Sequence, residues 1–137
     1  PGERLTEQTQ VYVADTVGEL RAFAAGALWV FMGGSLVDVG GHNLLEPAAL
    51  GKAIVTGRHL SNFRDEAAYL ASREALLIVE DIDEFGRVAE RLLGDPGEAA
   101  LLGRSAEKAA RAEAAGVYDR YCATFKARMA VLSDAAA

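Results

Sequence analysis

An uninterrupted apolar run, residues 27–32, leads straight into a loop that carries four glycines within residues 33–41. A run of this kind is typical of a parallel strand that is covered on both faces. The glycines permit backbone conformations closed to other residues and let a ligand approach the main chain closely. A short apolar helix is predicted directly afterwards, at residues 47–50, with its free N–H groups facing the same loop. This succession of strand, loop and helix is typical of a nucleotide-binding α/β unit that accepts an anion such as phosphate.

The rest of the chain alternates in the same way between short apolar runs and amphipathic stretches. Strands are predicted at residues 11–14, 27–32, 53–56 and 75–79. Helices are predicted at residues 47–50, 64–72, 98–115 and 117–132. Two more are predicted from their ends: one opens with a Thr16–Glu19 capping box and ends at Gly26, and the other is capped by Asp81 or Asp83. A turn is expected at residues 95–97, and Gly116 is expected to separate the last two helices. Four strands alternating with helices predict an α/β fold, a parallel sheet in a three-layer sandwich that binds ligands outside the carboxyl ends of its strands.

Composition is that of a folded domain and excludes several classes of function. The chain has 137 residues, 51% of them hydrophobic and 25% charged, which suits one domain with a real core. Its net charge of −6 argues against a nucleic-acid partner, and no apolar run approaches the roughly 20 residues that span a bilayer. Cys122 is the only cysteine and there are two histidines, so neither an internal disulfide nor a metal site is predicted. The chain begins at Pro1 rather than at a methionine, so we expect a fragment or a processed product.

Several polar residues of the glycine-rich segment and of the following loop are candidate ligand-binding groups. The glycine spacing fits neither the dinucleotide-binding fingerprint nor the Walker loop. Glu46 either caps the short helix, in part with Asn43, or accepts hydrogen bonds from the two hydroxyls of a ribose. His42 either contacts a phosphate, donates a proton, or pins the loop through its ring nitrogens, and Asn43 suits a helix cap or a positive φ. His59 and Asn62 follow the next strand and are expected on the same rim of the sheet.

The last predicted helix carries an apolar stripe that repeats every three or four residues. It consists of Tyr118, Tyr121, Phe125, Met129 and Leu132. Such a stripe packs either against the core of its own domain or against a companion domain. We predict a partner surface there, and self-association of the isolated chain through it.

Three motifs of the chain carry a resemblance to a known family. They are Asp15-Thr16-Val17-Gly18-Glu19-Leu20, the run from Gly33-Gly34-Ser35-Leu36-Val37 through Gly40-Gly41-His42-Asn43 to Glu46-Pro47-Ala48-Ala49-Leu50-Gly51-Lys52, and His59 with Asn62-Phe63. Together they closely resemble the C-terminal half of the 3-deoxy-D-manno-octulosonic acid (Kdo) transferases, over roughly residues 11–93. Where relatives often have proline, this chain has Asp38, Leu44, Ala53 and Arg58. Asp38 places a negative charge near the expected anion site, and Arg58 is expected to offset it.

The resemblance implies one Rossmann-like half of a two-domain GT-B glycosyltransferase fold, the half that holds the sugar-nucleotide donor. It implies that the intact enzyme transfers Kdo from CMP-Kdo to the lipid A precursor, in lipopolysaccharide biosynthesis, at the cytoplasmic face of the inner membrane of Gram-negative bacteria. By this resemblance the phosphate and the sugar acid are surrounded by Gly33, Gly34, Ser35, Gly40, Gly41, His42 and Asn43, while Glu46 holds the cytidine ribose and His59, Asn62 and Phe63 complete the donor rim. CMP is expected to leave by direct displacement, with no metal ion or cofactor.

The same resemblance places several parts of the enzyme outside this chain. The general base, the acceptor groove and the membrane-anchoring segment belong to the N-terminal domain of the family, so no catalytic residue is predicted here. Residues 1–137 are expected to be the donor-binding domain: soluble, inactive alone and a weak binder of donor at most, because half a cleft cannot orient two reactants. The final helix, about residues 117–134, is expected to pack on the N-terminal domain.

Two other functions are compatible with these residues. One is the donor domain of another GT-B glycosyltransferase, or of a sugar-nucleotide epimerase, that uses a uridine nucleotide. The other is a non-catalytic α/β interaction module whose glycine loop is merely a turn. The three hypotheses differ in what the loop is expected to bind: a cytidine nucleotide, a uridine nucleotide or no nucleotide.

Overall fold

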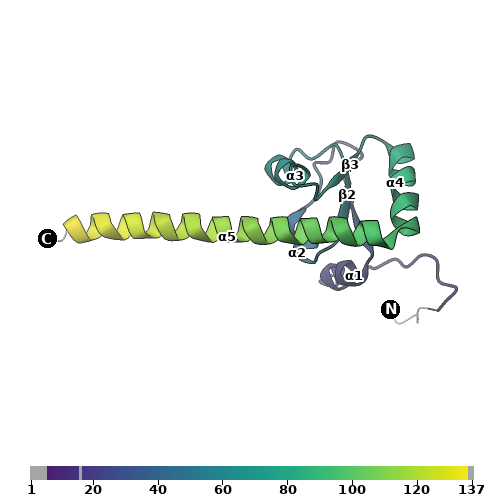
Figure 1. Ribbon diagram of the computed structural model, residues 1–137, viewed down its shortest axis with the longest axis horizontal. Coiled ribbons are helices and arrows are strands. Elements are labelled where there is room, and N and C mark those ends of the chain that lie inside the picture. Colours follow the sequence, from purple (N-terminus) through teal and green to yellow (C-terminus); the bar gives the residue numbers. More distant parts are fainter. Residues whose placement is uncertain (1–5, 16, 136–137) are drawn as a thin grey trace.

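The computed structural model of the chain describes residues 6–15 and 17–135, with side chains through residue 123. This part contains three strands, β1 (Trp29–Met32), β2 (Ala53–Gly57) and β3 (Leu77–Val79). It also contains five helices, α1 (Leu20–Gly26), α2 (Leu45–Ala49), α3 (Arg64–Ala71), α4 (Ile82–Gly94) and α5 (Pro96–Ala135). Figure 1 shows strands and shorter helices gathered at one end of α5, the rest of which extends away from them.

The three strands form a parallel sheet in the order β1-β2-β3, as the alternating pattern predicts. All five residues of the central strand β2 are buried. Neighbouring side chains of a strand point to opposite faces, and Ile54 and Val55 accordingly belong to two separate hydrophobic clusters. The first cluster includes Leu44 and Leu70, on the side of α2 and α3, while the second includes Leu92 of α4. Both faces of the sheet are therefore covered, which confirms the predicted α/β architecture.

Helix α5 packs on both clusters through alanines. Ala99 belongs to the cluster around Val55, and Ala106, Ala109 and Ala110 belong to the cluster around Ile54. Small side chains let the helix axis approach the sheet closely. Across the same contact the hydroxyl of Tyr69 donates a hydrogen bond to the carbonyl oxygen of Ala109, at 3.0 Å.

Helices α4 and α5 begin at aspartates that cap them. The Asp81 carboxylate accepts a hydrogen bond from the backbone N–H of Glu84 at 2.8 Å, so Asp81 is the cap rather than Asp83. The Asp95 carboxylate accepts one from the N–H of Glu98 at 3.0 Å, and Pro96 is the first residue of α5. The turn predicted at residues 95–97 is therefore the start of a helix, because proline fits the first helical position, where no intrahelical N–H bond is needed.

The strand predicted at residues 11–14 does not form in the structure. These residues have no regular secondary structure, and Val11 and Val13 are 80% and 78% exposed. A β-branched sequence becomes a strand only when it pairs with a neighbour and buries a face, and this segment does neither. Helix α1 begins at Leu20, and Thr16 of the predicted capping box lies outside the described residues.

The helix break predicted at Gly116 is also wrong. Residues 96–135 form one continuous helix of 40 residues. A glycine inside a helix costs only about 1 kcal/mol relative to alanine, and the flanking residues 109–115 are mostly alanine and charged helix formers. The two predicted helices are therefore one.

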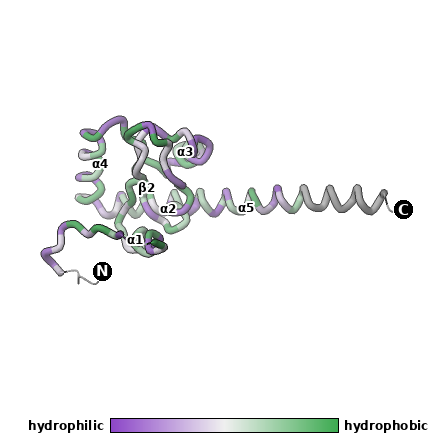
Figure 2. The backbone as a smooth tube through the Cα atoms, turned by 180° about the vertical axis from the view of Figure 1, so that it is seen from behind, coloured by the Kyte–Doolittle hydropathy of each residue, from purple (hydrophilic) through white to green (hydrophobic). Residues whose placement is uncertain are grey.

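The part of α5 beyond the core exposes the start of the predicted apolar stripe. Tyr118 and Tyr121 are 68% and 72% exposed, so they take no part in the core of this domain. Phe125, Met129 and Leu132 lie outside the residues whose side chains are described. In Figure 2 the coloured part of α5 continues beyond the folded end of the molecule. Packing of the stripe on a companion domain stays a prediction.

Truncating the chain after Gly116 is expected to leave the domain folded. The buried alanines of α5 end at Ala110, so the removed residues contribute no buried side chain that the structure describes. We expect the thermal midpoint to change by less than about 3 °C. Truncation after Arg104 is the control, because it also removes the three alanines of the first cluster and should unfold the domain. A truncation at Gly116 that unfolds the chain by circular dichroism would contradict this assignment.

Candidate functional site

The loop after β1 is fixed by the buried side chain of Ser35. Its hydroxyl donates a hydrogen bond to the carbonyl oxygen of Met32 and accepts one from the N–H of Gly57 at 2.8 Å. The carbonyl oxygen of Ser35 in turn accepts a hydrogen bond from the N–H of His59 at 2.9 Å. Ser35 is fully buried, so its hydroxyl joins the carboxyl ends of β1 and β2 and does not face a ligand.

The second glycine pair closes the loop and seats it against the loop after β2. The N–H of Gly41 donates to the carbonyl oxygen of Gly34 at 3.0 Å, and the carbonyl oxygen of Gly40 accepts from the N–H of Asn62 at 3.3 Å. Gly40 and Gly41 have φ values of 100° and 74°, a region that favours glycine. A Cβ on Gly41 would also lie 2.8 Å from the side chain of Leu60. The two glycines thus allow the loop after β1 to pack closely against the loop after β2.

A cavity of about 390 Å³ opens beside this loop, at the carboxyl end of β1. Its floor is the end of the strand, residues 30–33, which is mainly apolar. The rest of the lining comes from two segments, α1 with Leu20, Arg21 and Ala24, and the end of the loop with the start of α2, which contribute His42, Asn43, Glu46 and Pro47. The volume lies within the range of small-molecule sites, which combine an apolar lining with a few polar groups.

Two other cavities of similar size lie along α3 and α5. They have volumes of about 320 Å³ and 380 Å³ and contain no residue of the glycine loop. The cavity beside β1 is distinguished by its position at the carboxyl edge of a parallel sheet, where ligands of such folds bind. It also gathers His42, Asn43 and Glu46, which the sequence predicts to bind one ligand.

The sequence left helix capping and ligand binding open as roles for Asn43 and Glu46, and the structure separates the two roles. The side-chain oxygen of Asn43 accepts a hydrogen bond from the N–H of Leu45 at 2.9 Å, at the start of α2. Glu46 lies in the first turn of α2, is exposed and lines the cavity. Within the described residues its carboxylate makes no hydrogen bond or ion pair, so the capping box with Asn43 does not form. The carboxylate is therefore available to a ligand.

The eleven predicted site residues fall into two groups. The cavity is lined by Gly33, His42, Asn43 and Glu46. The loops that shape it are built by Gly34, Ser35, Gly40, Gly41, His59 and Asn62, with Phe63 half-buried as the residue before α3. His42 joins the two groups, because a Cβ on Gly34 would lie 3.7 Å from its Nε2 atom. His59 and Asn62 lie beside the glycine loop as predicted, but neither lines the cavity.

Two residues of this region, Arg21 and Gly57, lie outside the three motifs of the resemblance. Arg21 lies on α1, before the strand, and reaches the cavity only because α1 packs beside α2. Gly57 ends β2 and lies directly against the backbone of residues 35–36. Its position at a strand end was visible in the sequence, but its contact with the other loop was not.

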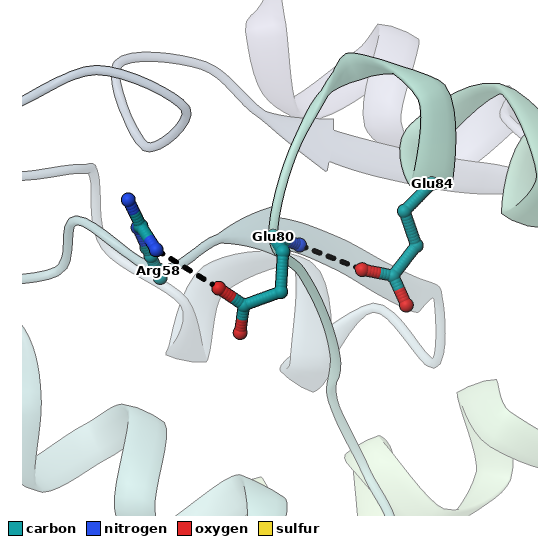
Figure 3. A network of polar contacts seen from close by, with 3 residues as sticks. All are labelled: Arg58, Glu80 and Glu84. Carbon is teal, nitrogen blue, oxygen red and sulfur yellow. Dashed lines mark hydrogen bonds and ion pairs between the residues drawn. The ribbon is translucent and has the colours of Figure 1, made fainter.

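An ion pair joins the carboxyl ends of β2 and β3 (Figure 3). Arg58 Nη1 lies 3.1 Å from Glu80 Oε2, and the Glu84 carboxylate accepts a hydrogen bond from the N–H of Glu80 at 2.8 Å. The two paired side chains are 60% and 65% exposed, so the pair contributes at most about 1 kcal/mol to stability. Arg58 is thus paired with Glu80, which differs from the expectation that it offsets Asp38. Asp38 itself does not line the cavity.

Among the described residues, no group of three or more His, Cys, Asp and Glu side chains is placed to hold a metal ion. None of the described helices is long and apolar enough to cross a membrane.

Comparisons with known proteins identify relatives of this chain. No protein-family model matches it. A 3-deoxy-D-manno-octulosonic acid transferase from Haemophilus influenzae is 37% identical over 100 residues, which cover 72% of this chain and 23% of that protein. A bifunctional glycosyltransferase/methyltransferase from Fusobacterium nucleatum is 33% identical over 87 residues, covering 64% of this chain and 14% of that protein. The chain thus spans about a quarter or less of the length of these relatives.

A solved structure resembles the fold as well as the sequence. It is the crystal structure of the C-terminal CMP-Kdo binding domain of WaaA from Acinetobacter baumannii, with a TM-score of 0.69 and 35% identity. The match covers 74% of this chain and 53% of that chain. The parallel sheet and this likeness define the chain as one Rossmann-like half of a GT-B glycosyltransferase fold. Within that class, the chain is a homologue of the C-terminal domain of the Kdo transferases.

Proposed function

We propose that this chain is the domain of a Kdo transferase that binds the donor CMP-Kdo. The observation that carries the proposal is the cavity at the end of β1, which gathers Gly33, His42, Asn43 and Glu46 from one continuous motif. The likeness to a domain described as binding CMP-Kdo, at 35% identity, supports the same ligand.

The lining of the cavity suits the parts of a nucleotide. Its apolar floor, residues 30–33, offers a surface for the flat face of a base. The unpaired carboxylate of Glu46 suits the two hydroxyls of a ribose, because an ionised carboxylate only accepts hydrogen bonds and hydroxyls donate them. His42, beside Gly34, is placed at the loop end of the cavity, where the phosphate would lie.

The intact enzyme would use this domain in a direct displacement. A hydroxyl of the lipid A precursor forms a bond to the anomeric carbon of Kdo, and the bond from that carbon to the phosphate oxygen breaks. CMP leaves with the electron pair of the broken bond, and the hydroxyl proton passes to a general base that the family keeps in its N-terminal domain. This chain's residues bind and orient the donor, and rate enhancement requires both reactants to be held together. The chain alone is therefore expected to bind without turnover.

The proposal also covers the cellular location of the intact enzyme and the packing of α5. The acceptor is a membrane lipid, so we propose that the intact protein acts at the cytoplasmic face of the bacterial inner membrane. The exposed end of α5, with Tyr118 and Tyr121 on its surface, is proposed to pack on the N-terminal domain or, in the isolated chain, on a second copy.

Titration of the isotope-labelled chain with nucleotides tests the donor assignment. We expect millimolar CMP to shift amide NMR signals of residues 33–46, whereas UMP and UDP at the same concentration leave them in place. Shifts with the uridine nucleotides alone would assign the site to another GT-B enzyme or to an epimerase. A spectrum that no nucleotide changes would favour the interaction module. The amide signals of α4, which does not line the cavity, are the internal control.

A further inference from the structure

Arg21 lines the same cavity as Glu46. It comes from α1, while Glu46 comes from α2, which packs beside α1. The Arg21 side chain is exposed, and its guanidinium makes no hydrogen bond or ion pair with any residue that the structure describes. An arginine that lines a cavity without a protein partner keeps all its hydrogen-bond donors for a ligand.

Lys52 and Arg58, the cations that flank β2, are both engaged by other residues. The Nζ atom of Lys52 donates a hydrogen bond to the carbonyl oxygen of Ala27 at 3.0 Å, and Arg58 is paired with Glu80. Neither of them lines the cavity. Of the described residues that do, Arg21 is the one with a permanent positive charge.

A negatively charged ligand in this cavity needs the positive charge of Arg21. The permanent anion of the cavity is Glu46, and the whole chain carries a net charge of −6, so the surroundings repel an anion. Helix α2 has only five residues, so its dipole offers little compensation. The donor in the proposed function carries two anionic groups, the phosphate and the carboxylate of the sugar acid. A planar guanidinium fits the paired oxygens of either group.

We propose that Arg21 is a ligand-binding residue that holds an oxyanion of the donor, with two parallel N–H···O bonds. This inference rests on the proposed function, because it assumes that an anionic nucleotide occupies the cavity. It adds a binding residue from α1, outside the glycine loop and outside the loop after β2. In the complex Arg21 neutralises the ligand charge that Glu46, bound to the ribose, would otherwise repel.

Binding of cytidine, CMP and CMP-Kdo to the wild-type chain and to R21Q, measured by amide NMR shifts, tests the proposal. We expect R21Q to bind CMP about fivefold more weakly than the wild type and to bind cytidine equally well. If the partner is the carboxylate, CMP binding is unchanged and the loss appears with CMP-Kdo alone. R21K is expected to recover part of the loss, because lysine keeps the charge but not the paired geometry. R87Q removes an exposed arginine of α4, outside the cavity, and should bind all three ligands as the wild type does.

The outcomes separate this inference from the function on which it rests. A wild-type chain that binds CMP, together with an R21Q variant that binds CMP and CMP-Kdo equally tightly, overturns the role of Arg21 and leaves the donor site standing. An equal loss for cytidine and CMP also overturns it, since it would show a structural effect rather than an anion contact. A wild-type chain that binds none of the three ligands overturns both proposals.

Discussion

Gly57→Ala is expected to lower the free energy of unfolding by about 3 kcal/mol or more. A Cβ at this position would overlap the carbonyl oxygen of Ser35 and lie 2.7 Å from the N atom of Leu36. The overlapped atoms are backbone, so they cannot rotate away as a side-chain end can. Relief requires the loop to move, and that breaks the hydrogen bonds that join Ser35 to Gly57 and to His59. Denaturant unfolding of the variant and the wild type measures the loss.

Gly86→Ala is the matched control for this substitution. Gly86 lies within α4, and a Cβ there would meet nothing within 4 Å. Alanine in a helix interior is favoured over glycine, so the control should be as stable as the wild type or more stable by up to about 1 kcal/mol. If the two variants unfold at the same denaturant concentration, the close contact of the two loops is not a constraint on the fold. A variant that does not fold at all agrees with the prediction.

Most of the fold could be predicted from the sequence, because each strand of the sheet is a short and mainly apolar run of residues. The run at residues 53–57 is buried at every position, and a parallel strand covered on both faces has that composition. The segment at residues 11–14 has the same residue types but remains exposed, because a strand also needs a neighbour to pair with. The helix break predicted at Gly116 is wrong for a related reason. A glycine ends a helix only where other signals agree, and there the neighbouring residues favour helix.

The candidate site could be predicted only as far as chain order determines it. The glycine loop and the loop after β2 come together because parallel neighbouring strands end at the same edge, and chain order shows this. The resemblance places Ser35 among the residues around the phosphate and the sugar acid, and the structure buries its hydroxyl between Met32 and Gly57. Arg21 was not predicted, because its place in the wall depends on how α1 packs beside α2. Both cases depend on tertiary neighbours that no local pattern contains.

Glu46→Gln is expected to weaken CMP binding about tenfold to thirtyfold. The carboxylate of Glu46 lines the cavity and has no partner among the described residues, so its contribution to the stability of the free domain is small. Glutamine keeps the shape of the side chain and one acceptor oxygen, but it loses the charge that strengthens both hydrogen bonds to the ribose. Amide NMR titration gives the affinity, and thermal unfolding should give the same midpoint as the wild type.

The deoxy nucleotide dCMP shows whether the ribose is the partner of Glu46. The wild type should bind dCMP more weakly than CMP, because one of the two hydroxyls is missing, while E46Q should discriminate little between the two ligands. Such a double comparison isolates the contact of one side chain with one hydroxyl from indirect effects. E90Q, a matched change of an exposed glutamate on α4, should leave both affinities unchanged. If E46Q prefers CMP over dCMP as strongly as the wild type does, Glu46 does not hold the ribose, and the carboxylate in the cavity needs another ligand group.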